Sequence, residues 1–201
     1  MVGVIRRMNR LRTLVNIRVG PGAAVLPKDV TRLHLEFGLQ TYDGHVGPKK
    51  FWRDYLPRLK YWNPAVPMVV NRVPVKDGPA TLTLYFREAG ATLPSDIPQP
   101  SSSWKGHSKA PAPVEGERIV TINMKHRRSE AILKEFMDKT GAVQLEPTPQ
   151  DEADIYHAKK LEEIGAVDRE RVRKETEAAK YEKKMLQQAQ SEAAAIRAAS
   201  A

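Results

Sequence analysis

The sequence of 201 residues contains no cysteine. A chain without thiols has no disulfide scaffold, no thiol nucleophile, no CxxC redox pair and no cysteine-ligated zinc site. It also has no apolar run that approaches the ~20 residues needed to cross a bilayer as a helix, so no membrane span is expected. These absences favour structural and binding roles over redox and thiol-dependent chemistry.

Motifs that carry other chemistry are missing as well. The sequence has no GxSxG, GxGxxG or Walker pattern. None of its five histidines is followed at i+3 or i+4 by a second ligand on a shared helix face, as a helical zinc site would favour. Acid pairs such as Glu162-Glu163 lie in a highly charged segment, where a solvated helix face explains them. We therefore expect no catalytic site, metal, cofactor or small-molecule substrate.

Acidic residues are scarce in only one part of the chain. From Asp151 onward, ten Lys and Arg residues stand against eleven Asp and Glu, whereas residues 1–150 hold 23 against 13. All of the basic excess in a net charge of +9 therefore lies in residues 1–150. A basic body followed by a charge-balanced tail favours a nucleic acid as the partner of the body.

The first 18 residues are rich in arginine and contain no acid. Val4, Met8, Leu11 and Val15 lie at helical spacing, which predicts an amphipathic helix. Such a segment is typical of mitochondrial targeting sequences, and a basic arm that lies on RNA is the alternative. Both can hold, and we expect the segment to direct import and to remain on the mature protein.

The centre of the chain is residues 48–72. Phe51, Tyr55, Leu59 and Trp62 recur at spacings of four, four and three, the period of one buried helix face. Pro57 lies inside this helix and predicts a kink or a tightened turn.

Further elements follow from alternation and end signals. Asn63-Pro64 ends the central helix, and 66–73 is the next expected strand. Strands are also expected at 30–37, 81–86 and 118–124, with His34 on the solvent face of the first and an Asp77-Gly78 hairpin before the third. A helix capped by Ser129 should end at Gly141.

The tail should consist of two consecutive helices. Thr148 to Asp151 form a capping box with proline at the first helical position. This helix should end at Gly165, and a second charged helix should run from about Asp168.

The expected order is strand, helix, three strands, helix and helical tail. A βαβ unit followed by ββα is the thioredoxin-like α/β arrangement, a four-stranded mixed sheet with packed helices. We expect a basic N-terminal arm (1–27), this domain (28–142) with a proline-rich excursion at 89–116, and a charged helical tail (143–201).

Basic residues form three groups that we expect to contact RNA. A solvated helix face is the alternative for the central group, and a loop with helix-flanking charge is the alternative at the strand-to-helix junction. The strand-to-helix junction also adds to the positive end of a helix dipole, which favours phosphate. Trp104 sits in a polar, proline-rich loop without an obvious core to join, so we expect it to stack on a base or insert into a partner protein. The expected RNA-binding residues are Arg6, Arg7, Arg10 and Arg12 in the arm, Lys49, Lys50, Arg53, Arg58, Lys60 and Arg72 in the central segment, and Lys125, Arg127 and Arg128 at the junction.

Several short motifs resemble one family. They are residues 9–12 (NRLR), 19–23 (VGPGA), 26–27 (LP) and, above all, 59–64 (LKYWNP). They resemble mitochondrial ribosomal proteins of a thioredoxin-like family. That family links a small-subunit protein of animal mitoribosomes, a large-subunit protein of fungal mitoribosomes and a small accessory subunit of respiratory complex I. The resemblance spans about residues 8–142, and both the 89–116 excursion and the tail from Asp151 depart from it.

This resemblance implies a structural, non-catalytic protein of the mitochondrial matrix. Its partners would be rRNA and neighbouring mitoribosomal proteins. The basic arm and the GPGA segment favour the large subunit. The small subunit and a protein-only scaffold in complex I remain as alternatives, and the charge excess in residues 1–150 favours RNA over the latter.

Overall fold

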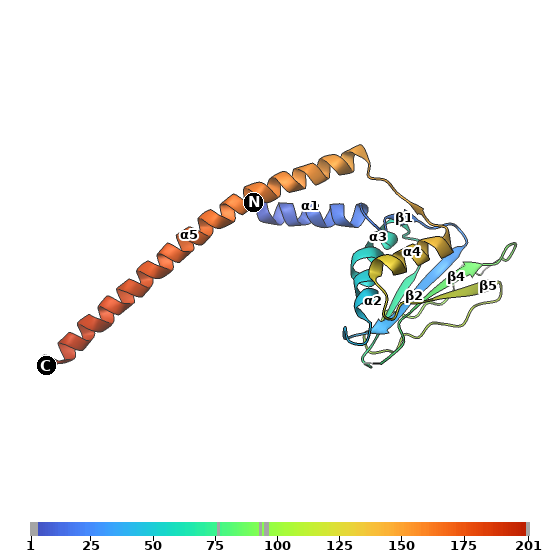
Figure 1. Cartoon of the computed structure of the whole chain (residues 1–201), viewed down its shortest axis with the longest axis horizontal. Helices are drawn as coiled ribbons and strands as arrows, with labels where there is room; N and C mark the ends of the chain where they lie inside the picture. Colours follow the sequence, from blue (N-terminus) through green and yellow to red (C-terminus); the bar gives the residue numbers. More distant parts are fainter. Residues whose placement is uncertain (1–3, 76, 93, 95–96, 200–201) are drawn as a thin grey trace. The chain divides into compact units, whose positions relative to one another are not determined.

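The computed structural model describes residues 4–75, 77–92, 94 and 97–199. Leu14–Asp151 forms one compact unit, and the second unit comprises Met1–Thr13 together with Glu152–Ala201. The first unit contains a four-stranded mixed sheet covered by helices (Figure 1), which confirms the predicted α/β class.

The sheet has the strand order β3-β2-β4-β5. Strand β2 (Val30–Gly38) pairs in parallel with β3 (Met68–Val73) and antiparallel with β4 (Thr81–Arg87). Strand β5 (Glu117–Asn123) then pairs antiparallel with β4. The parallel pair joined by a helical crossover and the antiparallel strands beside it form the βαβ-ββα arrangement expected from the sequence.

The expected hairpin at Asp77-Gly78 is wrong. β3 and β4 follow each other in the chain, but β2 lies between them in the sheet. The helical crossover places β3 beside β2 in parallel, so β4 takes the opposite edge of β2 and the connecting residues have to pass from one edge to the other.

The crossover is one helical stretch made of three parts. They are α2 (Val46–Lys50), the π-helical turn η1 (Phe51–Tyr55) and α3 (Leu56–Trp62). We expected a kink or a tightened turn at Pro57, but the turn before it is widened instead. Pro57 has no N–H for the carbonyl of Arg53 and its ring crowds that carbonyl, and a π turn relieves both conflicts.

One face of the sheet carries the apolar core. Phe51 and Leu59 are completely buried and Tyr55 is 8% exposed, as the spacing predicted, and they share a cluster with leucines of β2 and β4. Helix α4 (Ser129–Thr140) adds Ile132 and Phe136, whose ring lies 6.1 Å from that of Phe51 between centroids. Figure 1 shows α2, α3 and α4 gathered on this side of the sheet.

The ends of α4 agree with the prediction only in part. Gly141 follows the helix in the left-handed conformation, at φ 65°, as expected for a C-terminal glycine. The N-cap position belongs to Arg128, and Ser129 is the first helical residue, so the expected serine cap is wrong by one position.

The other face of the sheet is covered by the proline-rich segment, which overturns the expected exposure of His34. His34 is 2% exposed, and its Nε2 donates to the carbonyl of Ser108 at 2.7 Å. Tyr85 Oη donates to the carbonyl of Pro111 at 2.5 Å, and Arg32 Nη2 donates to the carbonyl of Ala112 at 3.2 Å. A segment rich in prolines has few N–H groups but keeps its carbonyl acceptors, so polar donors on the sheet hold it.

A second, two-stranded sheet belongs to the same unit. Strand β1 (Ala24–Val25) pairs antiparallel with β6 (Val143–Gln144). Ala24 is completely buried, and Leu145 N donates to the carbonyl of Ala23 at 2.9 Å. The segment that precedes the main sheet in the chain therefore pairs with the segment that follows it.

The N-terminal helix α1 runs over Val4–Arg18. Met8 and Val15 are buried, at 4% and 8% exposure, as the helical spacing predicted.

Helix α5 runs over Pro149–Ala199. The predicted capping box is confirmed, since Thr148 N donates to Asp151 Oδ2 at 3.2 Å and Asp151 N donates to Thr148 Oγ1 at 3.3 Å. The expected break at Gly165 is wrong, because one glycine costs a helix only about 1 kcal/mol and strong helix formers flank it. Among the described residues, no helix is both long and apolar enough to span a bilayer.

Candidate nucleic-acid interface

A hollow of about 510 Å³ lies where the N-terminal ends of α2 and α4 meet, and we call it the junction hollow. Four basic side chains line it, together with a single acid, Glu130. The hollow joins two basic groups that the sequence presented separately, one from the central helix and one from the strand-to-helix junction. Its basic side chains are Lys50, His126, Arg127 and Arg128.

Two glycines bring the walls of the junction hollow together. A Cβ atom on Gly47 would lie 1.7 Å from the carbonyl oxygen of Arg127, and one on Gly44 would lie 2.5 Å from Nδ1 of His126. His126 N also donates to the carbonyl of Gly44 at 3.1 Å. The site depends on this close backbone approach. Sequence reasoning missed it, since Asp43-Gly44 indicated only a polar loop.

Ion pairs neutralise part of the predicted junction cluster. Lys125 pairs with Asp43, and the hydrogen bond from its Nζ lowers the pKa of that carboxyl group. Arg127 pairs with Glu135, whose pKa is lowered first by Lys139 and then by Arg127. The predicted Lys125 and Arg127 side chains therefore hold the junction itself.

Arg128 and Lys50 remain available for an external anion. Both side chains are exposed, and among the residues that the structure describes neither has a hydrogen-bonding or ion-pair partner. The pKa of Asp54 is lowered chiefly by its hydrogen bond with Arg53 and, to a lesser degree, by the charge of Lys50. Arg128 also occupies the N-cap of α4 without making a side-chain capping bond to any described residue. The free N–H groups of that first turn and the helix dipole add to the attraction for a negative group.

The remaining cations of the central segment lie outside the junction hollow. Arg53 pairs with the adjacent Asp54, with Nε 2.7 Å from Oδ1. Arg58 donates to the carbonyls of Asn16 and Pro21 at 2.6 and 2.7 Å, and thereby fixes the C-terminal turn of α1. The Arg58 side chain therefore supports the fold, whereas Arg53 forms a local surface pair. Three further residues that the sequence predicted as RNA contacts do not line the hollow. They are Lys60, which is exposed, and Lys49 and Arg72, which are half-buried.

The N-terminal arginines lie on α1. Arg6, Arg10 and Arg12 are exposed, and Arg12 Nη1 lies 3.4 Å from Oε1 of Glu162. The side chain of Arg7 lies outside the described residues. An RNA contact through this arm stays a prediction.

Trp104 is 69% exposed, as expected for a tryptophan without a core to join. It lines a second hollow, of about 610 Å³, which we call the tryptophan hollow. Trp52 and Arg72 also line it, and the guanidinium of Arg72 lies 4.9 Å from the centre of the Trp52 ring.

The Asn63-Pro64 motif has a structural task. Asn63 Oδ1 accepts from Leu26 N, and its Nδ2 donates to the carbonyls of Ala24 and Leu59, all at 2.8 Å. The side chain thus joins the end of α3 to the β1 segment.

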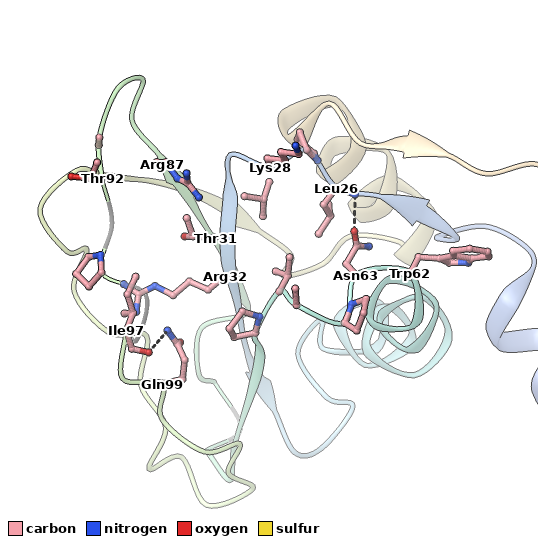
Figure 2. Close-up of a pocket in the computed structure, with 18 residues that line it drawn as sticks. Leu26, Lys28, Thr31, Arg32, Trp62, Asn63, Arg87, Thr92, Ile97 and Gln99 are labelled. Carbon is pink, nitrogen blue, oxygen red and sulfur yellow. Dashed lines mark hydrogen bonds between the residues drawn. The ribbon is translucent and has the colours of Figure 1, made fainter.

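A third hollow, of about 1010 Å³, opens beside the Asn63 side chain and is shown in Figure 2. Arg32 extends across it toward Ile97 and Gln99. Its guanidinium is already committed to Glu117, with Nη2 2.6 Å from Oε2.

Comparison with known proteins shows which family the chain resembles. Residues 48–129 match the mitochondrial ribosomal protein L51 / S25 / CI-B8 domain, and this span carries both Lys50 and Arg128. A Neurospora crassa protein is 56% identical over 201 residues, which is the full length of both chains. A Saccharomyces cerevisiae protein is 27% identical over 136 residues, covering 66% of this chain and 77% of its own.

A Schizosaccharomyces pombe protein is 35% identical over 60 residues, covering 30% of this chain and 44% of its own. All three relatives are named large ribosomal subunit protein mL61. These matches confirm the resemblance found in the sequence motifs. The chain belongs to the mitochondrial ribosomal protein L51 / S25 / CI-B8 family.

Proposed function

We propose that the chain is a structural constituent of the large subunit of the mitochondrial ribosome and that the junction hollow contacts rRNA. The full-length match to a relative named for the large subunit carries the first part. The role is structural and not enzymatic, and its place is the mitochondrion. The second part rests on the convergence of Lys50, Arg128 and the free end of α4 at one hollow.

The chemistry of the hollow suits a phosphate group. Lysine and arginine supply charge and hydrogen-bond donors, and the first turn of α4 supplies backbone N–H groups in a fixed direction. Contacts of this kind position a protein on RNA without reading its sequence, because A-form RNA is recognised mainly by shape and backbone. The hollow would therefore anchor the domain on the backbone of an rRNA helix.

A protein-only scaffold is the second candidate, since the family description also includes a complex I subunit. The charge distribution favours RNA, with 23 Lys and Arg against 13 Asp and Glu in residues 1–150. The three relatives are also named for a ribosomal subunit. Sedimentation of mitochondrial lysates separates the two candidates. The chain should co-migrate with large subunits, and co-migration with complex I or the small subunit would contradict the first part.

The rRNA contact is tested by the salt dependence of RNA binding. Lys50→Ala combined with Arg128→Ala should flatten the slope of log K against log salt by about 1.4–1.8, since each phosphate contact contributes about 0.7–0.9. Lys183→Ala combined with Lys184→Ala removes the same charge from exposed positions of α5 and should leave the slope unchanged. Equal slopes for the hollow variant and the wild type would refute the contact.

A further inference from the structure

The loop that carries Trp104 is tied to the edge of the sheet. Ser103 N donates to the carbonyl of Val70 at 2.9 Å, and Arg72 N donates to the carbonyl of Ser103 at 2.7 Å. Ser103 thus extends the sheet beyond β3 by one parallel bridge, opposite Asn71. The loop is a built feature of the fold, and it keeps a large aromatic ring at the surface.

The same loop closes on itself around one hydroxyl. Ser103 Oγ accepts from Lys105 N at 3.1 Å and from His107 N at 3.4 Å. Gly106 lies between them and has φ +78°. Its Cα atom faces Val73 and Pro74, so the turn packs next to β3. The backbone on both sides of Trp104 is therefore held, by the main-chain bonds of Ser103 on one side and by its hydroxyl on the other, which lowers the entropic cost of binding a ligand there.

The tryptophan hollow combines aromatic surface with positive charge. Trp104 and Trp52 supply indole rings, Arg72 stacks on Trp52, and Lys105 adds a second cation. The described lining contains no acidic side chain. Indole rings flanked by cations are the chemistry that recognises an unpaired base and its phosphates.

We propose that the tryptophan hollow binds a single unpaired base of RNA, stacked on Trp104, with Arg72 and Lys105 facing its backbone phosphates. This inference rests on the proposed function, because it assigns one further contact to the same rRNA partner. It also assigns a role to Trp104, a 69% exposed tryptophan for which no contact among the described residues accounts. Trp52 belongs to the helical stretch that also carries Lys50, so one stretch would face RNA at both hollows.

A peptide is the less suitable occupant. Protein partners of a doubly cationic slot need an acidic side chain at the matching position, whereas every nucleotide brings both a π face and a phosphate. The excess of basic residues in residues 1–150 attracts any RNA segment, and stacking then holds a base that is already unpaired.

The test compares two fluorescently labelled oligoribonucleotides of ten uridines, one normal and one with abasic sites, on the full-length chain. The wild type should bind the normal oligomer more tightly. Trp104→Ala should lose roughly 5- to 150-fold in affinity for it, which is the usual range for one stacked base. Trp104→Phe should restore part of that loss, and Tyr61→Ala, which removes a 49% exposed ring outside the hollow, should bind as the wild type does.

The outcomes separate this inference from the proposed function. Equal affinity of the wild type and Trp104→Ala for the normal oligomer, with the salt slope still dependent on Lys50 and Arg128, would overturn the base site alone. Normal RNA affinity of Trp104→Ala together with failure to join the large subunit would also overturn it and would identify a protein partner. If neither Trp104→Ala nor the combined Lys50→Ala and Arg128→Ala variant changed RNA binding, both the base site and the proposed rRNA contact would be overturned.

Discussion

The two faces of the main sheet are covered in opposite ways. The helical crossover and α4 bury side chains such as Phe51, Leu59 and Phe136 on one face, where contacts are apolar and made by side chains. On the other face, residues 97–116 bury Arg32, His34 and Tyr85, and the contacts are hydrogen bonds to backbone carbonyls.

This difference shows how a chain can cover a sheet without a second apolar core. Burial of a polar side chain costs free energy unless it forms hydrogen bonds, so the second face depends on an almost complete set of partners. The helical face depends on filled volume instead. The two faces should consequently respond to different substitutions.

Breaking the buried ion pair should give the largest effect. Arg32 and Glu117 side chains are 3% and 0% exposed. Arg32→Met or Glu117→Leu alone should lower the free energy of unfolding by about 3–5 kcal/mol, because each leaves one buried charge without its partner. The double variant should cost less than either single one. Urea unfolding followed by circular dichroism measures this, and costs that simply add would contradict a coupled pair.

Removing volume from the helical face should come next. Leu59→Ala should lower the free energy of unfolding by about 2–5 kcal/mol, since Leu59 is completely buried and the cavity cannot fully close. Val75→Ala, at a position that is 59% exposed, is the control and should stay within about 0.5 kcal/mol. A change that small for Leu59→Ala would mean that the helix face does not support the core.

Removing one hydrogen bond from the second face should have a smaller effect. Tyr85→Phe keeps the buried ring and deletes the hydroxyl that donates to the carbonyl of Pro111. The expected loss is about 0.5–1.5 kcal/mol, the net contribution of a typical hydrogen bond. Tyr42→Phe removes a hydroxyl from a ring that is 67% exposed and should change nothing measurable. If Tyr85→Phe and Tyr42→Phe lowered the free energy of unfolding equally, the hydrogen bond to the proline-rich segment would not stabilise the fold.

The smallest expected effect is a dependence on pH. Burial lowers the pKa of His34 below its ordinary 6.5, while the carbonyl of Ser108 and the charge of Glu36 oppose the shift. The unfolded chain then binds a proton more readily, so stability is complete above pH 6.5 and is lost as the pH falls below it.

His45 shares the direction of that shift, again chiefly through burial. His34→Gln should therefore reduce the pH dependence without abolishing it. Urea midpoints measured on both sides of pH 6.5 test this, and an unchanged pH dependence in His34→Gln would be the contrary result.

Sequence patterns predicted the helical face well because apolar periodicity reports burial directly. They identified Phe51, Tyr55 and Leu59 as core, the four strands and the capping box at Thr148. They failed on the second face, because alternation marks His34 as polar and cannot show that a distant backbone carbonyl will meet it. The same limit applied to the hairpin, since strand order depends on which edge of β2 is free and not on local turn residues.

The candidate site divides in the same way. Sequence named Lys50, Arg127 and Arg128 as cations, but only the fold shows that Lys50 and Arg128 share one hollow and that Arg127 is held by Glu135. The glycines that allow this approach leave no distinct signal, because Gly44 and Gly47 read as ordinary loop and helix-start residues. Charge is visible in a sequence, whereas pairing and proximity are not.

The most direct test of the rRNA contact uses ultraviolet cross-linking of purified mitochondrial large subunits, followed by mass spectrometry of the cross-linked peptides. The account predicts nucleotide adducts on the peptides that contain Lys50 and Arg128. Adducts that are absent from both peptides, in subunits where other proteins do cross-link to rRNA, would contradict it.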